Sequence, residues 1–523
     1  MIISRRNLLA MAGAALALAA CGGSSDDTAT TASTSAAATV GTTTASTAET
    51  TTASTVETTT ASTTGPTIGA TEGFNPLWIP PVLSGTSFDL TLSPSSNQLL
   101  DGSPSATIAY NGVAMWGPTL LMRAGDTVSV NVTNNLDEET TTHWHGLHLP
   151  AEMDGGPHQP IAAGDTWSPS WTVKNNAATY WYHPHAHELT WKQMNQGAGG
   201  FIIVQDDTEA ALALPRTYGV DDIPLVLTSR TFDADNQIDT AVIYGDVLLA
   251  NGVVNAELMA PAQMLRLRVL NAEIERAYTL GFADDRTFFV IGTDGGLLEA
   301  PVELNRLVML PGERYELVVD LGADALGSAV TMQSFNGGYD LGYPGGEPAQ
   351  SGDFGSLLNN TTFDVLRFTV TAPTDSAVMS LPSTLVPLSL WTAADATNER
   401  TVTITDEGPG TPFTFDDMAY DHEMIAHTVQ LGTTEAWHIQ NTETFSHSFH
   451  IHDVQFAIVS RSTGEVPAYE RGWKDTLYIQ RNELVTFVAR FDDYASSEHP
   501  FMYHCHMSNH EDEGLMGQFL VVE

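Results

Sequence analysis

The fold class is clearest in one stretch of the sequence, DTVSVNV at residues 126–132, where apolar and polar side chains alternate. A second stretch, LRLRV at residues 265–269, has the same period of two. Successive side chains of a β-strand point to opposite faces, so this alternation is typical of strands. The 43 glycines and 26 prolines punctuate such runs, and no long stretch keeps a helical period. The sequence therefore predicts an all-β protein.

A weak internal repeat divides the all-β part into three. Asn-Gly at 111–112 precedes a strand pattern at 127–134, and Asn-Gly at 251–252 precedes one at 264–271. A third version covers residues 435–441. The asparagines that close the three patterns are 137 and 170 residues apart. This spacing fits three β-sandwich domains, which we place at residues 74–208, 209–385 and 386–523.

The N-terminus has the pattern of an export signal over residues 1–21. Arg5 and Arg6 form a twin-arginine pair, and the apolar run that follows, residues 8–20, is too short to span a bilayer. The run ends in LAAC at 18–21, which resembles the lipobox of bacterial and archaeal lipoproteins. We expect export by the twin-arginine machinery, which carries folded proteins, and lipidation of Cys21. The alternative is a plain secretory signal with an incidental cysteine.

Residues 22–73 form a tract with no Lys, Arg, His or aromatic residue, in which the word TTAST occurs four times. Such a composition has nothing to bury, so it predicts a disordered linker between anchor and domains. We therefore expect a periplasmic or cell-surface protein that is held to the membrane through a lipid on Cys21.

Composition narrows the classes of function. Hydrophobic residues make up 42% of the 523 residues, which argues against wholesale disorder and against a protein of many membrane spans. The formal net charge is −43, and such a surface repels nucleic acid. Only two cysteines occur, Cys21 and Cys505, so a disulfide framework is excluded.

The histidines carry the chemistry. The 17 histidines include five pairs separated by one residue, far more than a random distribution would give. The pairs are His143/His145, His183/His185, His185/His187, His450/His452 and His504/His506. Residues i and i+2 of a strand share a face, so each pair can offer two imidazoles to one metal site. Structural zinc is the rival interpretation, but separated pairs with a single mature cysteine are not a usual zinc module.

The stretch YHCH at 503–506 favours copper. It places the thiol of Cys505 on one face of a strand and the two flanking imidazoles on the other. His510 follows five residues later, and His447 precedes the His450 pair. Two histidines and a cysteine are the ligand set of a blue-copper electron-transfer site. The flanking imidazoles then point into a second site.

These motifs together resemble the multicopper oxidases, in particular the three-domain bacterial laccases, bilirubin oxidases and cuprous oxidases. The resemblance covers nearly all of residues 75–523. It is carried by HWHG at 143–146, DGGP at 154–157, WYHPH at 181–185, PGER at 311–314, HSFHIH at 447–452 and HCHMSNH at 504–510. It implies three cupredoxin-like Greek-key β-sandwich domains, the middle one a copper-free spacer.

The resemblance also implies four copper ions and eleven ligands. Type 1 copper takes His447, Cys505 and His510. Type 2 copper takes His143 and His450. The type 3 pair takes His145, His183, His185, His452, His504 and His506. The other seven histidines are expected to lie beside the ligands or at the surface and not to bind copper, with His187 the first candidate for an exception: His148, His158, His187, His422, His427, His438 and His499.

The reaction implied is one-electron oxidation of a donor at type 1 copper, coupled to four-electron reduction of dioxygen to water. That reduction consumes protons, so carboxylates near the cluster have a role. Asp154 and Glu511 match acidic positions that the family uses for proton delivery. The alternative makes Asp154 a turn residue before two glycines and Glu511 a solvated charge.

One position departs from the bacterial pattern. Relatives commonly place a methionine ten residues after the cysteine as a weak axial ligand, and here that residue is Leu515. Leucine cannot coordinate, so the type 1 ion should be three-coordinate and its reduction potential raised. The alternative is a shift of one residue that lets Met516 serve.

Two main hypotheses for the class of electron donor stay open. The first is a laccase-like oxidase of phenols and aromatic amines, with Glu443 either near the electron-entry edge or a solvated rim charge. The second is a cuprous oxidase for copper tolerance, although no methionine-rich insert is present: residues 340–446 hold only Met379, Met418 and Met424. A third hypothesis, from another class of function, is a non-catalytic scaffold that has lost its copper. The presence of a suitable residue at all eleven ligand positions argues against it.

Overall fold

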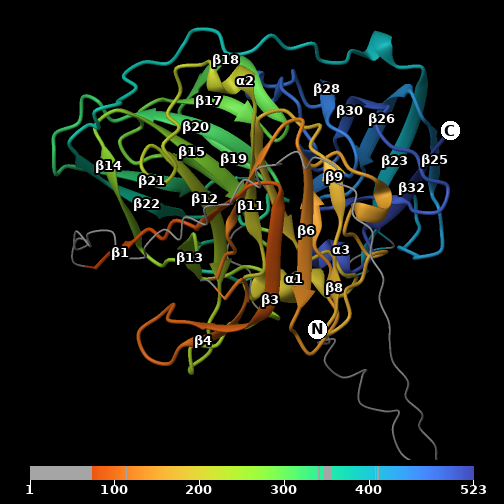
Figure 1. Cartoon of the computed structure of the whole chain (residues 1–523), viewed down its shortest axis with the longest axis horizontal. Coiled ribbons are helices and arrows are strands. Elements are labelled where there is room, and N and C mark those ends of the chain that lie inside the picture. Colours follow the sequence, from red (N-terminus) through yellow and green to blue (C-terminus); the bar gives the residue numbers. More distant parts are fainter. Residues whose placement is uncertain (1–72, 113–114, 340–341, 347–354, 407, 409–410) are drawn as a thin grey trace, which may run out of the picture. The chain divides into compact units, whose positions relative to one another are not determined.

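The computed structural model describes residues 73–523 except 113–114, 340–341, 347–354, 407 and 409–410. The described part is nearly all β, with six sheets and short helices (Figure 1). The sheets form three pairs, and each pair is a β-sandwich, as the sequence predicted. The three α-helices are α1 (Thr190–Asn195), α2 (Asp207–Ala210) and α3 (Ser508–Asp512). No helix among the described residues is long and apolar enough to cross a membrane.

The first sandwich is built from residues 82–205. One sheet has the order β2 (Val82–Ser84), β5 (Thr119–Arg123), β11 (Gly200–Gln205), β10 (Ala178–His183), β7 (His143–His145). The other has the order β4 (Ser105–Tyr110), β3 (Ser87–Asn97), β6 (Thr127–Asn134), β8 (Thr166–Trp167), with β9 (Ser170–Thr172) also on β6. Residues 127–132 of the first alternating stretch lie in β6, where every second residue is buried.

The middle sandwich is built mainly from residues 222–371. One sheet has the order β1 (Asn75–Pro76), β14 (Ala256–Pro261), β22 (Thr362–Thr371), β21 (Ala329–Phe335), β16 (Tyr278–Phe282), β19 (Leu307–Met309). The other has the order β13 (Val247–Ala250), β12 (Asp222–Arg230), β15 (Met264–Asn271), β20 (Arg314–Asp320), β17 (Phe288–Thr293), β18 (Gly296–Leu304).

The third sandwich is built from residues 398–522. One sheet has the order β24 (Phe413–Phe415), β23 (Asn398–Asp406), β26 (Thr433–Asn441), β30 (Leu484–Phe491), β28 (Phe456–Arg461). The other has the order β25 (His427–Gln430), β32 (Met516–Val522), β31 (Phe501–Cys505), β27 (His447–Ile451), β29 (Thr476–Ile479). Our domain boundaries near 208 and 385 stay predictions; both fall between sheets, the first within α2.

The internal repeat has a common structural role. β6, β15 and β26 occupy equivalent places, each paired in parallel with an earlier strand of its sandwich. Each ends in an asparagine, and its side-chain nitrogen donates to two backbone carbonyl oxygens at 2.7 to 3.1 Å. The closing residues are Asn134, Asn271 and Asn441. These amides satisfy buried backbone groups at the same corner of each sandwich.

The second alternating stretch differs from the first because both faces of β15 are buried. Its arginines form ion pairs: Arg266 contacts Glu316 at 2.5 Å, and Arg268 contacts Glu316 and Asp222 at 2.7 Å each. Arg268 also donates to Thr179 of β10 at 3.1 Å. A buried charge needs such partners, and here they join the middle sandwich to the strand that carries His183.

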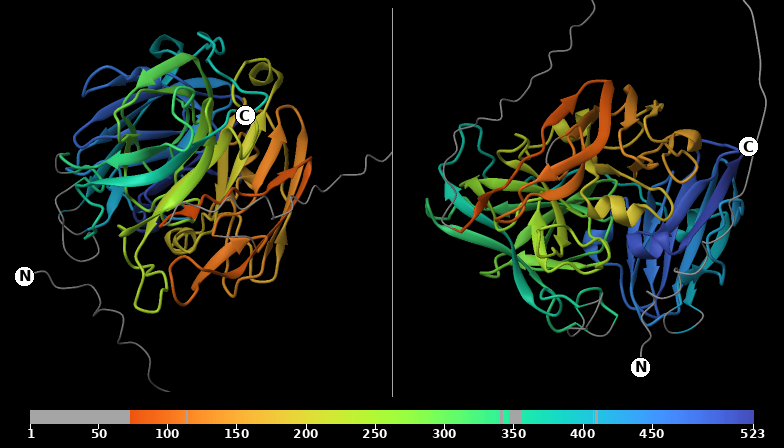
Figure 2. Two further views of the ribbon diagram at one scale, coloured as in Figure 1. Left: turned by 90° about the vertical axis from the view of Figure 1, so that its left-hand side faces the viewer. Right: turned by 90° about the horizontal axis from the view of Figure 1, so that it is seen from below.

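The three sandwiches contact one another. In Figure 2 the first sandwich (orange to yellow), the middle one (green) and the third (blue) lie side by side. Asp512 of α3 accepts hydrogen bonds from the backbone of α1, and Arg314 of β20 reaches both Thr179 and Asp475. The histidine motifs of the first and third sandwiches therefore meet where the three sandwiches join.

Candidate metal centres

Strand β31 carries metal donors on both of its faces. The Cys505 side chain lies in the apolar core of the third sandwich. The flanking imidazoles point the other way: His504 lies 4.5 Å from His185, measured between ring centroids, and His506 Nε2 lies 3.2 Å from His145 Nδ1. The period of two of a strand produces this division. One three-residue run thus belongs to two sites.

The first site is a set of three buried donors around the Cys505 sulfur. Nδ1 of His447 and Nδ1 of His510 each lie 3.7 Å from Sγ. None of the three side chains is more than slightly exposed. Burial raises the pKa of the Cys505 thiol to about 12, lowers the pKa of His510 to about 3 and lowers the pKa of His447 well below its ordinary value. Both imidazole nitrogens are therefore available as neutral donors, and a metal that binds the sulfur displaces its proton.

The surroundings of this site are apolar. The ring of Phe413 packs edge-on against His447 and His510, at 4.6 and 4.8 Å between centroids. Leu515 is fully buried and lies in the same core cluster as Cys505. The backbone N–H of Cys505 donates a hydrogen bond to the carbonyl oxygen of Leu515. Met516 pairs with His504 across β31 and β32. Because paired residues share a face, Met516 lies on the His504 side of the strand and Leu515 on the sulfur side.

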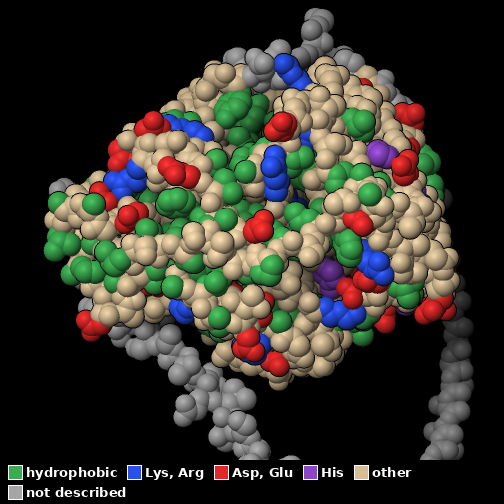
Figure 3. All heavy atoms as spheres, turned by 90° about the horizontal axis from the view of Figure 1, so that it is seen from above, with side chains coloured by type: hydrophobic (Ala, Val, Ile, Leu, Met, Phe, Trp, Pro, Cys, Tyr) green, Lys and Arg blue, Asp and Glu red, His purple; other side chains and the backbone are tan. Residues whose placement is uncertain are grey.

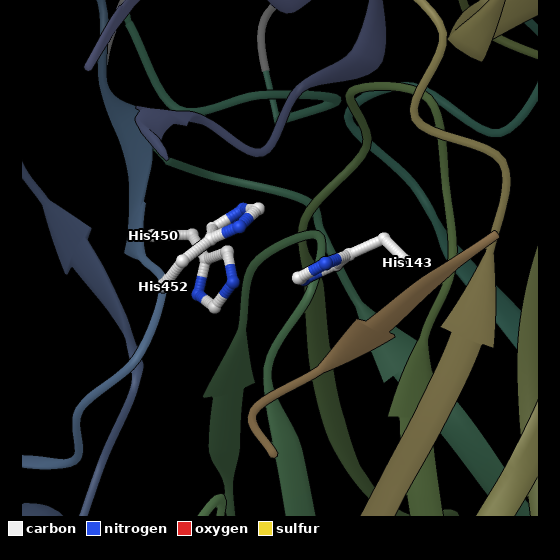
Figure 4. Close-up of side chains that lie close together, drawn as sticks. All are labelled: His143, His450 and His452. Carbon is white, nitrogen blue, oxygen red and sulfur yellow. The ribbon is translucent and has the colours of Figure 1, made fainter. Parts of the chain in front are cut away.

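The second site is a cluster of eight buried histidines from the first and third sandwiches. They are His143 and His145 on β7, His183 on β10, His185 after it, His450 on β27, His452 after it, His504 on β31 and His506 after it. Figure 4 shows His143 approaching from its strand while His450 and His452 approach from the opposite side. On the face drawn in Figure 3, histidine side chains show in only small areas, as expected when most are buried.

The rings of the cluster interlock across the two sandwiches. His143 stacks on His452 at 3.9 Å between centroids, and His145 stacks on His450 at 3.7 Å. Three groups of three histidines bring one ring nitrogen from each member within 4.8 Å of the others. The groups are His143/His450/His452, His143/His145/His183 and His185/His452/His504. The eight imidazoles are thus close enough to hold several metal ions.

The outer ring nitrogens are held so that the inner ones face the cluster. Nδ1 of His143, His183 and His450 each donate to a backbone carbonyl oxygen, at 2.8 to 2.9 Å. A neutral imidazole with its proton on Nδ1 has its lone pair on Nε2. Those three Nε2 atoms are buried and have no hydrogen-bond partner among the described residues. A metal ion would satisfy them, so the residues fit one.

Electrostatics agree with a set of neutral ligands. Burial, followed by the neighbouring imidazoles, lowers the pKa of His450 and His452 well below the ordinary histidine value. Burial also lowers the pKa of His183 and His506 in the same direction. Metal binding needs the deprotonated nitrogen, so the fold keeps these four imidazoles in their ligating form near neutral pH.

His145 is oriented the other way by a carboxylate that the sequence analysis missed. Its Nε2 lies 3.1 Å from Oδ1 of Asp475, so Nδ1 faces the cluster. Asp475 is fully buried and accepts two hydrogen bonds of 2.6 Å from Arg314 of the middle sandwich. Its backbone oxygen also accepts from His450. The only sequence signal was PGER at 311–314, which contains Arg314 but suggests no partner for it.

Asp154 contacts the cluster directly. Its Oδ2 lies 2.6 Å from Nδ1 of His452, and its backbone oxygen accepts from His143. The turn that follows requires glycine: Gly155 has a φ of +78°, and a Cβ there would lie 1.9 Å from the carbonyl oxygen of Thr142. Asp154 is thus both the turn residue and a partner of two imidazoles.

Glu511 is buried on the other side of the cluster. Its Oε1 lies 2.9 Å from Nδ1 of His185, and its Oε2 lies 3.2 Å from Nδ1 of His504. Although burial opposes ionisation, the two imidazoles hold the pKa of the Glu511 carboxyl well below its ordinary value. It is therefore not a solvated charge.

The short helix α3 connects these parts. Asn509 donates to Glu275 of the middle sandwich, His510 faces the sulfur, and Glu511 contacts the histidine cluster. Asp512 accepts from the backbone of Thr190 and Trp191 in α1. Four consecutive residues of one turn thus reach both candidate sites and the other two sandwiches.

Glu443 lies at the end of the third sandwich, half-buried, where its carboxylate accepts a hydrogen bond from the backbone N–H of Asp406 at 3.1 Å. The seven remaining histidines lie outside the donor groups found among the described residues. His148 contacts Asp493 and Gln455, and His187 packs against Tyr420. Cys21 and the signal and linker segments up to residue 72 lie outside the described residues.

Comparison with known proteins agrees with this architecture. Two family models, each described as multicopper oxidase, match residues 92–209 and 392–523. The multicopper oxidase of Staphylococcus aureus is 30% identical over 470 residues, 87% of this chain and 94% of that protein. The cell division protein FtsP of Escherichia coli is 31% identical over 462 residues, 85% and 92% of the two chains.

A solved structure, that of a laccase-like multicopper oxidase from Ochrobactrum sp., has a TM-score of 0.76 and 32% identity. The match covers 86% of this chain and all of that one. The sandwiches, the buried histidines and these relatives define a copper-binding oxidoreductase. The chain belongs to the multicopper oxidase family.

Proposed function

We propose that the protein is a laccase-like oxidase with four copper ions, which oxidises phenols or aromatic amines and reduces dioxygen to water. The observation that carries the proposal is the sequence His504-Cys505-His506 on β31, whose sulfur and imidazoles face two separate donor sets. Adjacent residues give electrons a covalent path of about 3.8 Å per Cα step between the two.

In this proposal the ligands divide as the family pattern implies. Type 1 copper would be held by His447, Cys505 and His510, and Leu515, on the sulfur side of the strand, would not coordinate it. Type 2 copper is held by His143 and His450. The type 3 pair is held by the remaining six, His145, His183, His185, His452, His504 and His506. When bound, the copper supplies one-electron oxidation of the donor and four-electron reduction of dioxygen.

The carboxylates have two roles in the proposal. Asp154 and Glu511 hold imidazole Nδ1 atoms, which orients the rings toward the cluster. A third carboxylate at the cluster, Asp475, is tied up in its ion pair with Arg314, so Asp154 and Glu511 are the acidic side chains that would pass protons to the cluster. Both carboxylates are buried.

A similar enzyme and the lack of a methionine-rich insert in this sequence both favour aromatic electron donors. The Ochrobactrum enzyme has oxidase activity toward lignin model compounds and lignosulfonate. The methionine-rich insert of the cuprous oxidases is missing from this sequence. We therefore favour small aromatic donors, with Glu443 placed at the rim near the electron-entry edge to accept a phenolic proton.

The alternatives predict different results in one experiment. Steady-state oxygen consumption with a dimethoxyphenol and with Cu(I) compares the laccase and cuprous oxidase readings on the same copper-loaded protein. Faster turnover of Cu(I) would show that Cu(I), and not an aromatic compound, is the preferred electron donor. No oxygen consumption with either donor, from a protein that takes up no copper, would favour a scaffold without catalysis.

We further propose that the protein is exported by the twin-arginine machinery and anchored to the membrane through a lipid on Cys21. The twin arginines, the apolar run and the LAAC ending support this. Mass spectrometry of the mature N-terminus checks it: a lipid-modified Cys21 at the first position is expected, and an unmodified cysteine or cleavage elsewhere contradicts it.

A further inference from the structure

The middle sandwich contains no histidine, yet one of its carboxylates reaches the proposed type 1 site. Glu275 lies between β15 and β16 and is fully buried. Its Oε2 atom is 3.7 Å from Nε2 of His510. A carboxylate close to the outer nitrogen of a metal-bound histidine is a common way in which proteins tune a metal site.

Hydrogen bonds hold both carboxylate oxygens of Glu275 in place. The hydroxyl of Tyr244 donates to its Oε1 at 2.5 Å, and the side-chain amide of Asn509 donates to its Oε2 at 2.6 Å. Beside it, the backbone N–H of Ser508 donates to the carbonyl oxygen of Ile274 at 3.0 Å. These contacts fix the start of α3 against the middle sandwich.

The hydrogen bonds also indicate the charge state of Glu275. Both of its oxygens accept from groups that can donate, a hydroxyl and an amide N–H. An ionised carboxylate only accepts hydrogen bonds, so its two oxygens meet both donors directly. The carboxylate form is therefore the one that the surroundings satisfy.

The two imidazoles of the proposed type 1 site differ in what their outer nitrogens face. Both rings turn Nδ1 toward the Cys505 sulfur, so in the neutral ligating form each carries its proton on Nε2. Nε2 of His447 is buried and has no hydrogen-bond partner among the described residues. Nε2 of His510 faces the carboxylate of Glu275 instead.

We infer that Glu275 is a positioning residue of the type 1 site, which orients His510 and lowers the reduction potential of the ion bound there. The inference rests on the proposed function. A fixed negative charge in a buried site favours the more highly charged oxidised ion over the reduced one. This effect opposes that of Leu515, whose lack of a donor atom raises the potential. The middle sandwich is then more than a spacer.

The experiment compares two buried glutamates that are two residues apart. Glu275→Gln removes the charge next to His510 with almost no change in shape. Glu273→Gln is the matched control, because Glu273 is equally buried and accepts a hydrogen bond of 2.5 Å from Tyr278 inside the middle sandwich. Redox titration of the blue absorption of the copper-loaded protein measures the potential, and thermal unfolding measures stability.

In Glu275→Gln we expect the ratio of reduced to oxidised type 1 copper at a fixed potential to rise about tenfold, equivalent to about 59 mV for one electron. Glu273→Gln should leave this ratio unchanged, and Glu275→Asp, which keeps the charge, should return most of the shift. An unchanged potential in Glu275→Gln, or an equal shift in Glu273→Gln, overturns the inference while leaving the proposed function intact.

A measurement on the unaltered protein covers the case in which Glu275→Gln does not fold. Pulsed electron paramagnetic resonance of the type 1 signal should give two different couplings for the outer nitrogens, one for His510 beside the carboxylate and one for His447. Equal couplings overturn the inference. A copper-loaded protein without any blue band overturns the proposed function and this inference with it.

Discussion

Arg314 and Asp475 form a buried two-point ion pair, with two N–O distances of 2.6 Å, that joins the middle sandwich to the third. Asp475 in turn holds Nε2 of His145, a residue of the first sandwich, at 3.1 Å. The Asp475 carboxylate thus connects the third sandwich to the other two, and it also orients the His145 imidazole. The cluster depends on the middle sandwich although no histidine comes from it.

Replacing Asp475 with Asn should therefore weaken both stability and metal binding. Removing one partner of a buried ion pair costs about 3 to 5 kcal/mol, because the other charge is left uncompensated. Loss of the carboxylate that orients a ligand typically lowers metal affinity about 10- to 100-fold. Thermal unfolding and copper content after dialysis measure the two effects.

The control for this variant is Asp324→Asn. Asp324 forms a similar two-point pair with Arg286, at 2.7 and 2.8 Å, but the pair is partly exposed and belongs to the middle sandwich alone. Its loss should cost about 1 kcal/mol or less and leave the copper content unchanged. Equal copper loss in the two variants would show that Asp475 acts only through general stability.

The two proposed sites should be separable by mutation. Cys505→Ser removes the only sulfur ligand but leaves the strand and its two flanking imidazoles in place, so the blue colour and oxidase activity should be lost while copper still binds at the cluster, up to three ions. His143→Ala should do the reverse, keeping the blue colour while stopping dioxygen reduction. Absorption spectra, copper analysis and oxygen consumption measure these outcomes. A blue Cys505→Ser protein, or normal turnover in His143→Ala, would show that the ligand assignment is wrong.

The axial position can be tested by adding a donor. Leu515 lies on the sulfur side of the strand and Met516 on the His504 side. Leu515→Met should place a thioether near the type 1 ion and lower its reduction potential. Met516→Leu, the control, should leave the potential unchanged. If instead Met516→Leu raises the potential and Leu515→Met does nothing, Met516 is the axial residue.

Ion pairs between the first and third sandwiches, partly exposed at the surface, predict that stability depends on pH. Asp493 of the third sandwich contacts His148 and accepts from Lys174 at 2.8 Å, both in the first sandwich. Although burial opposes ionisation, these partners lower the pKa of Asp493 from 3.8 to about 2. A lowered carboxyl pKa means that the stabilisation is present above pH 4 and is lost as the pH falls toward 2.

Asp493→Asn should accordingly lower stability by about 1 kcal/mol at neutral pH, after allowance for solvent screening of this partly exposed pair. The difference in Tm between the variant and the unaltered protein should shrink below pH 4. Thermal unfolding at a series of pH values measures it. A difference that stays constant down to pH 2 would mean that the Asp493 charge does not contribute.

Much of this protein could be predicted from its sequence because the informative patterns are local. The period of two predicts strands, the three closing asparagines predict three sandwiches, and His504-Cys505-His506 predicts donors on two faces of one strand. These features depend on neighbours in the chain and on backbone geometry that is the same in every strand. The fold class and the donor types followed from them.

The partners that hold the donors could not be predicted in this way. Asp475 lies 330 residues from His145, Glu275 lies 235 residues from His510, and a carboxylate has no local pattern that identifies its partner. The same holds for Leu515 and Met516, where the choice depends on which face of β32 turns toward the sulfur. Only the packing of three sandwiches brings these groups within reach, because burial far from water makes such charged contacts strong and specific.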